Sequence, residues 1–206
     1  MARPVSITDD SMLRAAREEF LAHGIRATSA AIARRAGVSH GILFHRFGSK
    51  EALFAAAMQS AEQAAGPLVD LRSRGGKGDV RETLVELGEL LLDRFFVVIP
   101  AQVITWANPN SGKTAKPGKT VNPVKDFKEK GVRGQRQFAQ YLRAEARLKR
   151  IRDVDPYVVA QTFSGALWFY AFEQVTGARL RGANAAPERG AFVRQLVDFI
   201  WGGLQA

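Results

Sequence analysis

Residues 30–53 read AAIARRAGVSHGILFHRFGSKEAL and decide the fold of the first part of the chain. Apolar residues at helical spacing stop at Gly37, resume after Ser39, stop again at Gly48 and restart after Ser49. Glycine favours the left-handed conformation that ends a helix, and a serine side chain caps the first N–H groups of the next one. The stretch therefore predicts three helices, of which the middle one has only about two turns.

A short helix that follows another helix and a three-residue turn is typical of a helix-turn-helix, in which the second helix lies in the major groove of DNA. If Leu43 and Phe47 point inward, the opposite face of this short helix is open. A Gly-Val-Ser turn also joins helices in ordinary bundles, so the turn alone leaves both interpretations open. The residues expected on or beside the open face are His40, Gly41, Ile42, Phe44 and His45.

The rest of the chain repeats helical spacing and is poor in strand and hairpin patterns, which predicts an all-α fold. A first helix is expected from Ser11 to His23, with Ser11 as its N-cap, and either Thr28 or Ser29 can cap the second. Residues 72–79, RSRGGKGD, are interpreted as a flexible connection. Further helices are expected over 80–96, 123–150, 155–176 and 187–204, with a long loop over 108–124.

These elements divide into an N-terminal helix-turn-helix domain, residues 1–65, and a larger helical domain, residues 66–206. The N-terminus lacks the apolar segment of a signal peptide, and no apolar run reaches the roughly 18 to 20 residues that span a bilayer. We therefore expect a soluble, cytoplasmic protein.

Composition argues against an enzyme. The chain has no cysteine, which excludes disulfides and thiolate chemistry, and its three histidines all lie in the first quarter at spacings that match no standard metal site. The larger domain thus lacks the commonest catalytic groups, and we expect no metal, no cofactor and no enzymatic activity. A protein- or anion-binding helical module without sequence-specific DNA binding remains the alternative.

The positive charge is not concentrated in the predicted helix-turn-helix. The formal net charge is +10, but residues 1–65 hold eight Lys or Arg against six Asp or Glu, whereas residues 113–152 hold thirteen against three. Three interpretations of the basic segment stay open: a solvated helix face with a loop, general attraction to DNA, or recognition of an anionic ligand or protein partner.

From Leu13 to Met58 the sequence resembles the TetR (tetracycline repressor) family of bacterial transcriptional regulators, through AAREEFLAHGIRATS, IARRAGVSHGILFHRF and SKEALF. The resemblance implies a homodimer whose third helices read an inverted-repeat, palindromic DNA operator. It also implies a C-terminal helical domain for ligand binding and dimerisation, in which a small-molecule effector releases the protein from DNA. Repression is the usual mode of regulation in this family.

Carried onto this chain, the resemblance assigns DNA contacts residue by residue. Thr28 or Ser29 and Lys50 would hold the phosphate backbone, and helix N-termini suit that role because they present unpaired N–H groups. The usual tyrosine and Thr or Ser of the third helix are replaced by Phe44 and Ile42, which have no hydroxyl. The residues that would face the groove are Ser39, His40, Gly41, Ile42, Phe44 and His45.

The larger domain offers aromatic and apolar residues that can line a pocket for a small, largely hydrophobic effector. They lie around Pro100 and on the two helices that follow, and each could equally be an ordinary core residue. The candidate effector-binding residues are Phe95, Phe96, Gln102, Val103, Trp106, Phe138, Tyr141, Trp168 and Phe172.

The last two expected helices combine small residues with large aromatic ones, in AQTFSGALWFYAFEQV and FVRQLVDFIWGGL. Two such helices can pair with their copies as a four-helix bundle, although packing inside one chain could also explain them. The candidate dimer-interface residues are Phe163, Leu167, Tyr170, Phe192, Leu196, Phe199 and Ile200.

Overall fold

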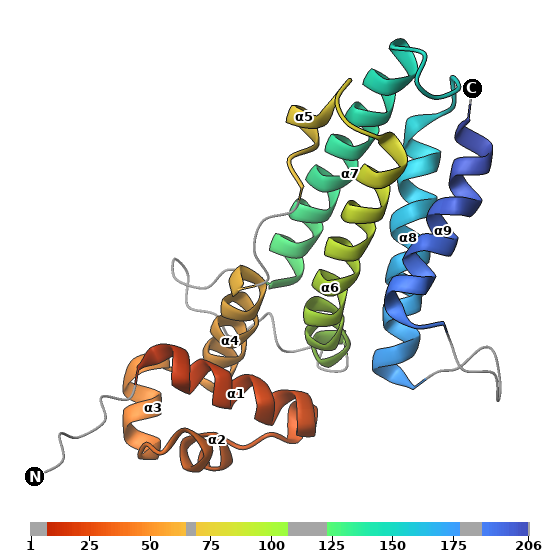
Figure 1. The fold of residues 1–206 in the computed structure, drawn as a ribbon. Helices are drawn as coiled ribbons and strands as arrows, with labels where there is room; N and C mark the ends of the chain where they lie inside the picture. Colours follow the sequence, from red (N-terminus) through yellow and green to blue (C-terminus); the bar gives the residue numbers. More distant parts are fainter. Residues whose placement is uncertain (1–7, 65–68, 107–122, 178–186, 206) are drawn as a thin grey trace, which may run out of the picture. The chain divides into compact units, whose positions relative to one another are not determined.

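The computed structural model of the protein describes residues 8–64, 69–106, 123–177 and 187–205. Within these ranges the chain forms helices and no strand (Figure 1), which confirms the predicted all-α fold. None of the helices in these ranges is long and apolar enough to span a membrane. The predicted loop over 108–124 lies outside the described residues as far as residue 122.

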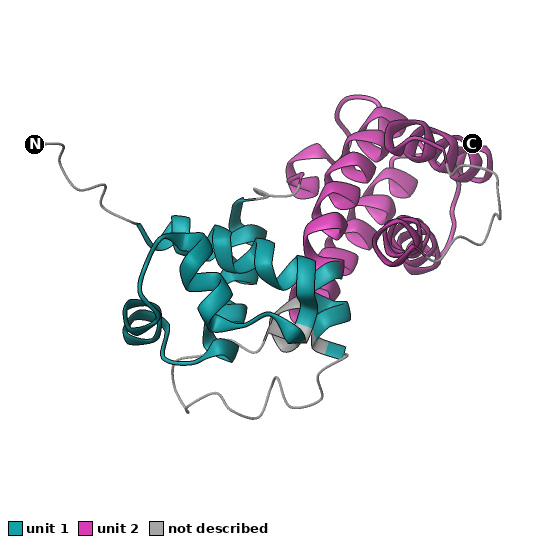
Figure 2. Ribbon diagram, turned by 90° about the horizontal axis from the view of Figure 1, so that it is seen from below, with its two compact units in different colours: residues 1–66, 100–127 teal, residues 67–99, 128–206 magenta. Residues whose placement is uncertain are grey.

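The chain divides into two compact units, shown in two colours in Figure 2. The first unit comprises residues 1–66 and 100–127, and the second comprises residues 67–99 and 128–206. The domain boundary expected between residues 65 and 66 lies outside the described residues. A second division falls at Pro100, inside helix α6 (Val80–Trp106), where proline has no N–H to donate to the preceding turn.

The helices that begin the first unit are α1 (Asp9–His23), the 3-10 turn η1 (Gly24–Arg26), α2 (Ser29–Ala36), α3 (His40–Phe47) and α4 (Lys50–Ala64). Helix α1 starts earlier than predicted, because Thr8 rather than Ser11 is its N-cap and accepts a hydrogen bond from the Ser11 N–H at 3.3 Å. Thr28, and not Ser29, caps α2 by accepting from the Ala31 N–H at 3.1 Å.

The first unit has its own hydrophobic core. Phe20 of α1 and Phe54 of α4 meet edge to face, with ring centroids 5.0 Å apart. Each such buried side chain contributes about 1.5–3 kcal/mol relative to exposure. The buried core residues are Met12, Ala16, Phe20, Ala27, Ile32, Ala33, Leu43, Leu53, Phe54, Ala57, Met58 and Ala101.

The second unit contains α5 (Leu71–Arg74), most of α6 and of α7 (Pro123–Arg147), and the whole of α8 (Pro156–Thr176) and α9 (Arg189–Leu204). Helices α6 to α9 run side by side along this unit (Figure 1). Helix α6 continues past its predicted end at Phe96, through Pro100 to Trp106. Helix α7 ends at Arg147, sooner than predicted, and Asp155 caps α8 as expected by accepting from two backbone N–H groups.

Residues 72–79, predicted as a flexible connection, begin inside α5 and are held by a tertiary contact. The Asp70 carboxylate caps α5 by accepting from the Arg72 N–H at 3.1 Å. The Gly76 N–H then donates to Glu145 of α7 at 2.8 Å, and the Glu145 side chain is fully buried. Gly76 has a φ of +72°, which a side chain would strain.

Close helix packing in the second unit depends on a glycine of α6. A Cβ at Gly88 would lie 2.7 Å from Val193 of α9 and 3.1 Å from Phe163 of α8. Nearby, Tyr170 of α8 stacks on Phe192 of α9 with centroids 4.2 Å apart. The absence of a side chain at Gly88 thus lets α6 approach both later helices.

Candidate nucleic-acid interface

Helix α3 is bounded on both sides by the predicted turn residues. Gly37 ends α2 in the left-handed conformation, with φ of +69°. The Ser39 hydroxyl accepts from the Ile42 N–H at 3.2 Å and so caps α3. Gly48 has φ of +80°, and Ser49 caps α4 through the Ala52 N–H at 3.1 Å. The predicted order of helix, turn, short helix and turn is confirmed.

One side of α3 is anchored and the other is open. Leu43 is 1% exposed and Phe47 packs against the same core, as predicted. Phe44 is half-buried, and its ring lies 4.5 Å from the ring of His40, centroid to centroid. The exposed residues of α3 are His40, Gly41, Ile42, His45 and Arg46.

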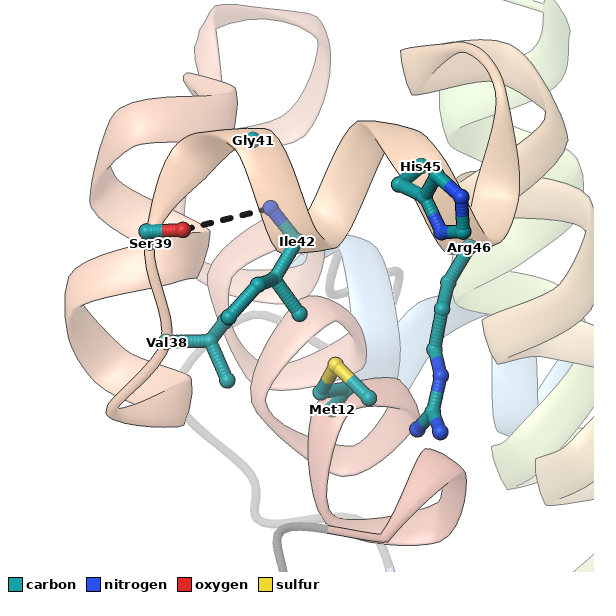
Figure 3. Close-up of a pocket in the computed structure, with 7 residues that line it drawn as sticks. All are labelled: Met12, Val38, Ser39, Gly41, Ile42, His45 and Arg46. Carbon is teal, nitrogen blue, oxygen red and sulfur yellow. Dashed lines mark hydrogen bonds between the residues drawn. The ribbon is translucent and has the colours of Figure 1, made fainter.

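A shallow cavity of about 580 Å³ lies between α1 and α3. Figure 3 shows the Ile42 and Arg46 side chains extending toward Met12 of α1, while Gly41 and His45 lie farther from it. Arg46 forms an ion pair with Asp9 in the first turn of α1. The residues that line the cavity are Met12, Val38, Ser39, Gly41, Ile42, His45 and Arg46.

Sequence reasoning missed Arg46. It lies four positions after Ile42, so helical spacing puts both on one face, and this spacing was the signal available. A guanidinium is the commonest reader of guanine edges and an effective phosphate ligand. Here its charge is compensated by the Asp9 carboxylate.

The expected phosphate contacts lie at helix N-termini. Thr28 is exposed at the start of α2, Ser29 is that helix's first residue, and Lys50 is the first residue of α4 and half-buried. Free N–H groups and the positive end of the helix dipole favour an anion at such positions. These contacts would fix register and orientation on DNA without reading sequence.

Helix α2 is held on α1 by ion pairs. Arg35 donates from Nε to Glu19 at 3.1 Å and from Nη1 to Glu18 at 3.2 Å. Glu19 is buried and also lies 3.4 Å from His23. Both contacts of Arg35 are therefore with carboxylates of the protein itself.

The candidate effector-binding residues are distributed over both units, and none lines the cavity beside α3. In the second unit Phe138 packs against Phe163 at 5.4 Å, and Trp168 stacks on Phe172 at 5.1 Å, both between ring centroids. Phe95, Phe138 and Tyr141 are buried, and Phe96, Trp168 and Phe172 are half-buried; in the first unit Gln102 is buried, Val103 is half-buried and Trp106 is exposed.

Two of these residues carry a buried polar group. The Gln102 carbonyl oxygen is buried without a hydrogen-bond partner. Burial raises the pKa of the Tyr141 phenol, and the neighbouring Thr83 hydroxyl opposes this in part. Tyr141 therefore keeps its proton at neutral pH and can serve as a hydrogen-bond donor.

The candidate dimer-interface residues divide into buried and exposed sets. Phe163 and Leu167 are fully buried within one chain, and Tyr170 and Ile200 are nearly so, which leaves them little surface to offer a partner. Phe192 and Leu196 are half-buried, and Phe199 is 80% exposed. Sequence reasoning missed the exposed Val158 and Phe169, which lie on the same face of α8 at positions i and i+11.

Among the described residues, no three His, Asp or Glu side chains are grouped as a metal site would require. No curated protein sequence matches the chain.

Comparison with known proteins agrees with this geometry. The model of bacterial regulatory proteins, tetR family, matches residues 12–57. A putative TetR-family transcriptional regulator from Mesorhizobium loti has a TM-score of 0.67 and 19% identity, covering 97% of this chain and 100% of its own.

Two further solved structures share the fold. The TetR family regulator PfmR from Thermus thermophilus has a TM-score of 0.65 at 22% identity, covering 96% of this chain and 100% of its own. A TetR family regulator from Pseudomonas syringae has a TM-score of 0.64 at 24% identity, covering 98% of each chain. Residues 12–57, which hold the helix-turn-helix, are thus similar to bacterial regulatory proteins of the tetR family, and the whole chain shares the fold of solved TetR-family regulators.

Proposed function

We propose that the protein is a repressor that binds an inverted-repeat operator as a homodimer and leaves it when a small, largely hydrophobic effector binds. The observation that carries the DNA-reading part is the exposed face of α3. His40, Ile42 and His45 are exposed there, while Leu43 fixes the helix from the other side. A rigidly supported helix with one open face is what major-groove reading needs.

The residues on that face suit a specific division of labour. His40 and His45 can donate to base edges or phosphates, and Ile42 can contact a thymine methyl. Gly41 lets the backbone of α3 approach the DNA closely. Because few of these side chains make bidentate base contacts, DNA shape is expected to contribute part of the specificity.

Phosphate anchoring is assigned to the helix ends beside α3. Thr28 and Ser29 begin α2, and Lys50 begins α4, so their contacts would bracket the recognition helix. The hydroxyls of Thr28 and Ser39 already accept from their own helices, which leaves each hydroxyl proton free to donate to a phosphate oxygen.

The exposed apolar surface of α8 and α9 supports the homodimer. Val158 and Phe169 are 61% and 43% exposed, and Phe199 is 80% exposed. Gly165 of α8 and Gly202 of α9 have open space where a Cβ would stand, so another helix can approach closely. Exposed aromatic residues beside small ones are typical of helix pairing between subunits.

The half-buried aromatic residues of the second unit support an apolar effector. Trp168 and Phe172 stack on each other and remain partly accessible, so a ligand can reach them. Variants Trp168→Ala and Phe172→Ala should bind the operator normally and resist release by the effector. Loss of operator binding in either variant would mean that these residues serve folding instead.

The test of the proposed function is selection of genomic fragments by the purified protein, with footprints read at moderate salt. The expected result is protection of an inverted repeat with two half-sites one or more helical turns apart, because a two-fold dimer presents two copies of α3. Deleting the gene should raise transcription from the adjacent promoter. Lowered transcription would show activation, and protection of a single half-site would refute the dimer.

A further inference from the structure

A second cavity lies where α7 ends and the chain turns into α8. Figure 1 shows this turn at one end of the second unit. Its volume is about 630 Å³, within the roughly 300–1,000 Å³ typical of small-molecule sites. Its residues are Arg143, Ala146, Arg147, Lys149, Ile151, Asp153, Val154 and Pro156, and we call it the α7–α8 groove. Nothing in the proposed DNA-reading function uses it.

The lining of the groove combines cations with an apolar floor. Ile151 is 2% exposed, and Ala146, Val154 and Pro156 are half-buried, so these side chains form a fixed surface. The three basic side chains, Arg143, Arg147 and Lys149, are exposed around it. Only one carboxylate, that of Asp153, is present in the lining. The groove therefore carries a formal charge of +2.

The three cations differ from the neighbouring Arg150 in their partners within the described residues. No ion pair among the described residues includes Arg143, Arg147 or Lys149; Arg143 lies over the ring of Tyr157, 5.9 Å from its centroid. Arg150, next in the chain, differs: it pairs with the buried Glu145 and donates to the Gly78 carbonyl. The charge of Arg150 is therefore compensated by the protein, whereas the three cations around the groove can bind an anionic ligand.

Lys149 of the groove has a backbone conformation that glycine usually adopts. Lys149 donates to the Ala146 carbonyl at 2.9 Å and Arg150 donates to the Glu145 carbonyl at 3.0 Å, the hydrogen-bond pattern of a Schellman helix end. Lys149 occupies the position that glycine usually takes, with φ of +57°, and is the one non-glycine residue with positive φ among those described. A side chain is strained in that conformation.

From this geometry we infer that the α7–α8 groove binds a small organic phosphate, a dianionic phosphate monoester with an apolar body. Two guanidiniums and an ammonium match phosphate oxygens through charge-assisted hydrogen bonds, and a dianion balances the +2 charge of the lining. The apolar floor of Ile151, Val154 and Pro156 would receive the organic part. This site is separate from the proposed effector residues and does not depend on them.

Calorimetric titration of the full-length protein with phenyl phosphate tests this inference. At pH 8 this probe is a dianion, because the second phosphate pKa is about 6. At constant ionic strength it should bind one per chain, and more tightly than inorganic phosphate because its ring contacts the floor. Equal affinity for both probes would overturn the assignment of an organic ligand.

Three variants separate a site from general attraction. Arg147→Gln and Lys149→Gly should each weaken phenyl phosphate binding about tenfold, as loss of one charge-assisted contact predicts. Arg136→Gln removes the same charge from an exposed position of α7 outside the groove and should change affinity less than twofold. Equal weakening by Arg136→Gln and Arg147→Gln would refute the groove.

Lys149→Gly has a second readout. Glycine relieves the positive-φ strain, so the melting temperature should rise while phenyl phosphate binding falls. A rise in melting temperature with unchanged binding would show that Lys149 has no ligand role and would overturn the inference. Binding of a DNA duplex of unrelated sequence is measured as well. If Arg147→Gln weakened binding to this duplex and left phenyl phosphate binding unchanged, the groove would contact nucleic acid and the inference would be overturned. Operator footprints are scored separately, so failure here leaves the proposed repressor untouched.

Discussion

Helix α3 and the end of α7 differ in whether their basic side chains form ion pairs with carboxylates of the protein. Arg46 of α3 is paired with Asp9, and Arg35 of the neighbouring α2 is paired with Glu18 and Glu19. At the end of α7 the arginines and lysine around the groove have no such partners among the described residues. The comparison teaches that exposed geometry and helix caps, more than local charge, distinguish the proposed DNA-reading surface of this protein.

The largest expected effect is loss of the anchor beneath α3. Leu43→Ala should destabilise the first unit by about 2–5 kcal/mol, because a fully buried leucine is replaced by a cavity. Chemical denaturation followed by circular dichroism measures the change. Leu142→Ala, a substitution at an equally buried position of α7, is the matched control for the second unit. If Leu43→Ala left operator affinity intact, support of α3 by the core would not matter for DNA reading.

The next effect concerns specificity. His45→Ala should lower operator affinity by about 1–3 kcal/mol while affinity for unrelated DNA changes little, because base contacts and not phosphate contacts discriminate. His40→Ala should act in the same direction and should also remove the packing of the His40 ring on Phe44. Competition binding against random duplexes measures the ratio. If both histidines can be replaced without changing sequence preference, the recognition face is placed incorrectly.

The affinity for DNA of any sequence should depend more on where a basic residue lies than on the net charge of the protein. Lys50→Ala should weaken binding to all DNA about tenfold and lower the salt slope by about one unit, since one phosphate contact disappears. Arg136→Gln on α7 removes an equal charge and should have little effect. A similar loss in both variants would mean that the basic half of α7 attracts DNA directly, and the contrast between the two regions would fail.

The helix caps separate a stability effect from a functional one. Ser39→Ala and Asp155→Ala each remove an N-cap, of α3 and α8 respectively, and should each cost about 1 kcal/mol of stability. Only Ser39→Ala should also weaken operator binding, because α3 carries proposed DNA contacts and α8 carries none. Denaturation midpoints and operator affinities of the two variants provide the comparison. Equal operator losses would indicate an effect of stability alone.

The local features of the first unit could be predicted from sequence. The residues that end and cap the helices act only on backbone groups within a few positions of themselves; they are Gly37, Ser39, Gly48 and Ser49. The inward positions Leu43 and Phe47 follow from the same helical spacing. Their correct prediction reflects signals that are complete within a dozen residues.

The features that were not predicted from the sequence depend mainly on contacts between residues far apart in the chain. Residues 72–79 look flexible until Glu145, far along the chain, supplies an acceptor for the Gly76 N–H. Helix α6 continues through Pro100 although proline inside a helix removes a backbone hydrogen bond and usually kinks or ends the helix. The candidate dimer residues Phe163 and Leu167 are as apolar as interface residues, and only the structure shows that both are buried within one chain, Phe163 beside Gly88 of α6.

The smallest expected effect tests whether the ion pair of Arg46 in α3 lowers the general affinity of the protein for DNA. Asp9→Asn removes the carboxylate that pairs with Arg46, and the freed guanidinium should tighten binding to all DNA twofold to fivefold, in line with the roughly 0–1 kcal/mol of an exposed ion pair. The salt slope should steepen by about one unit.

Asp10→Asn is the matched control for this change, because it removes the same charge from the next residue of α1, which is exposed. If both variants tightened binding equally, the gain would come from net charge alone. A gain confined to Asp9→Asn would show that the protein restrains its own recognition-helix arginine. Weak general affinity would then be a property built into α1, so that the operator is distinguished by the contacts of α3 and less by charge.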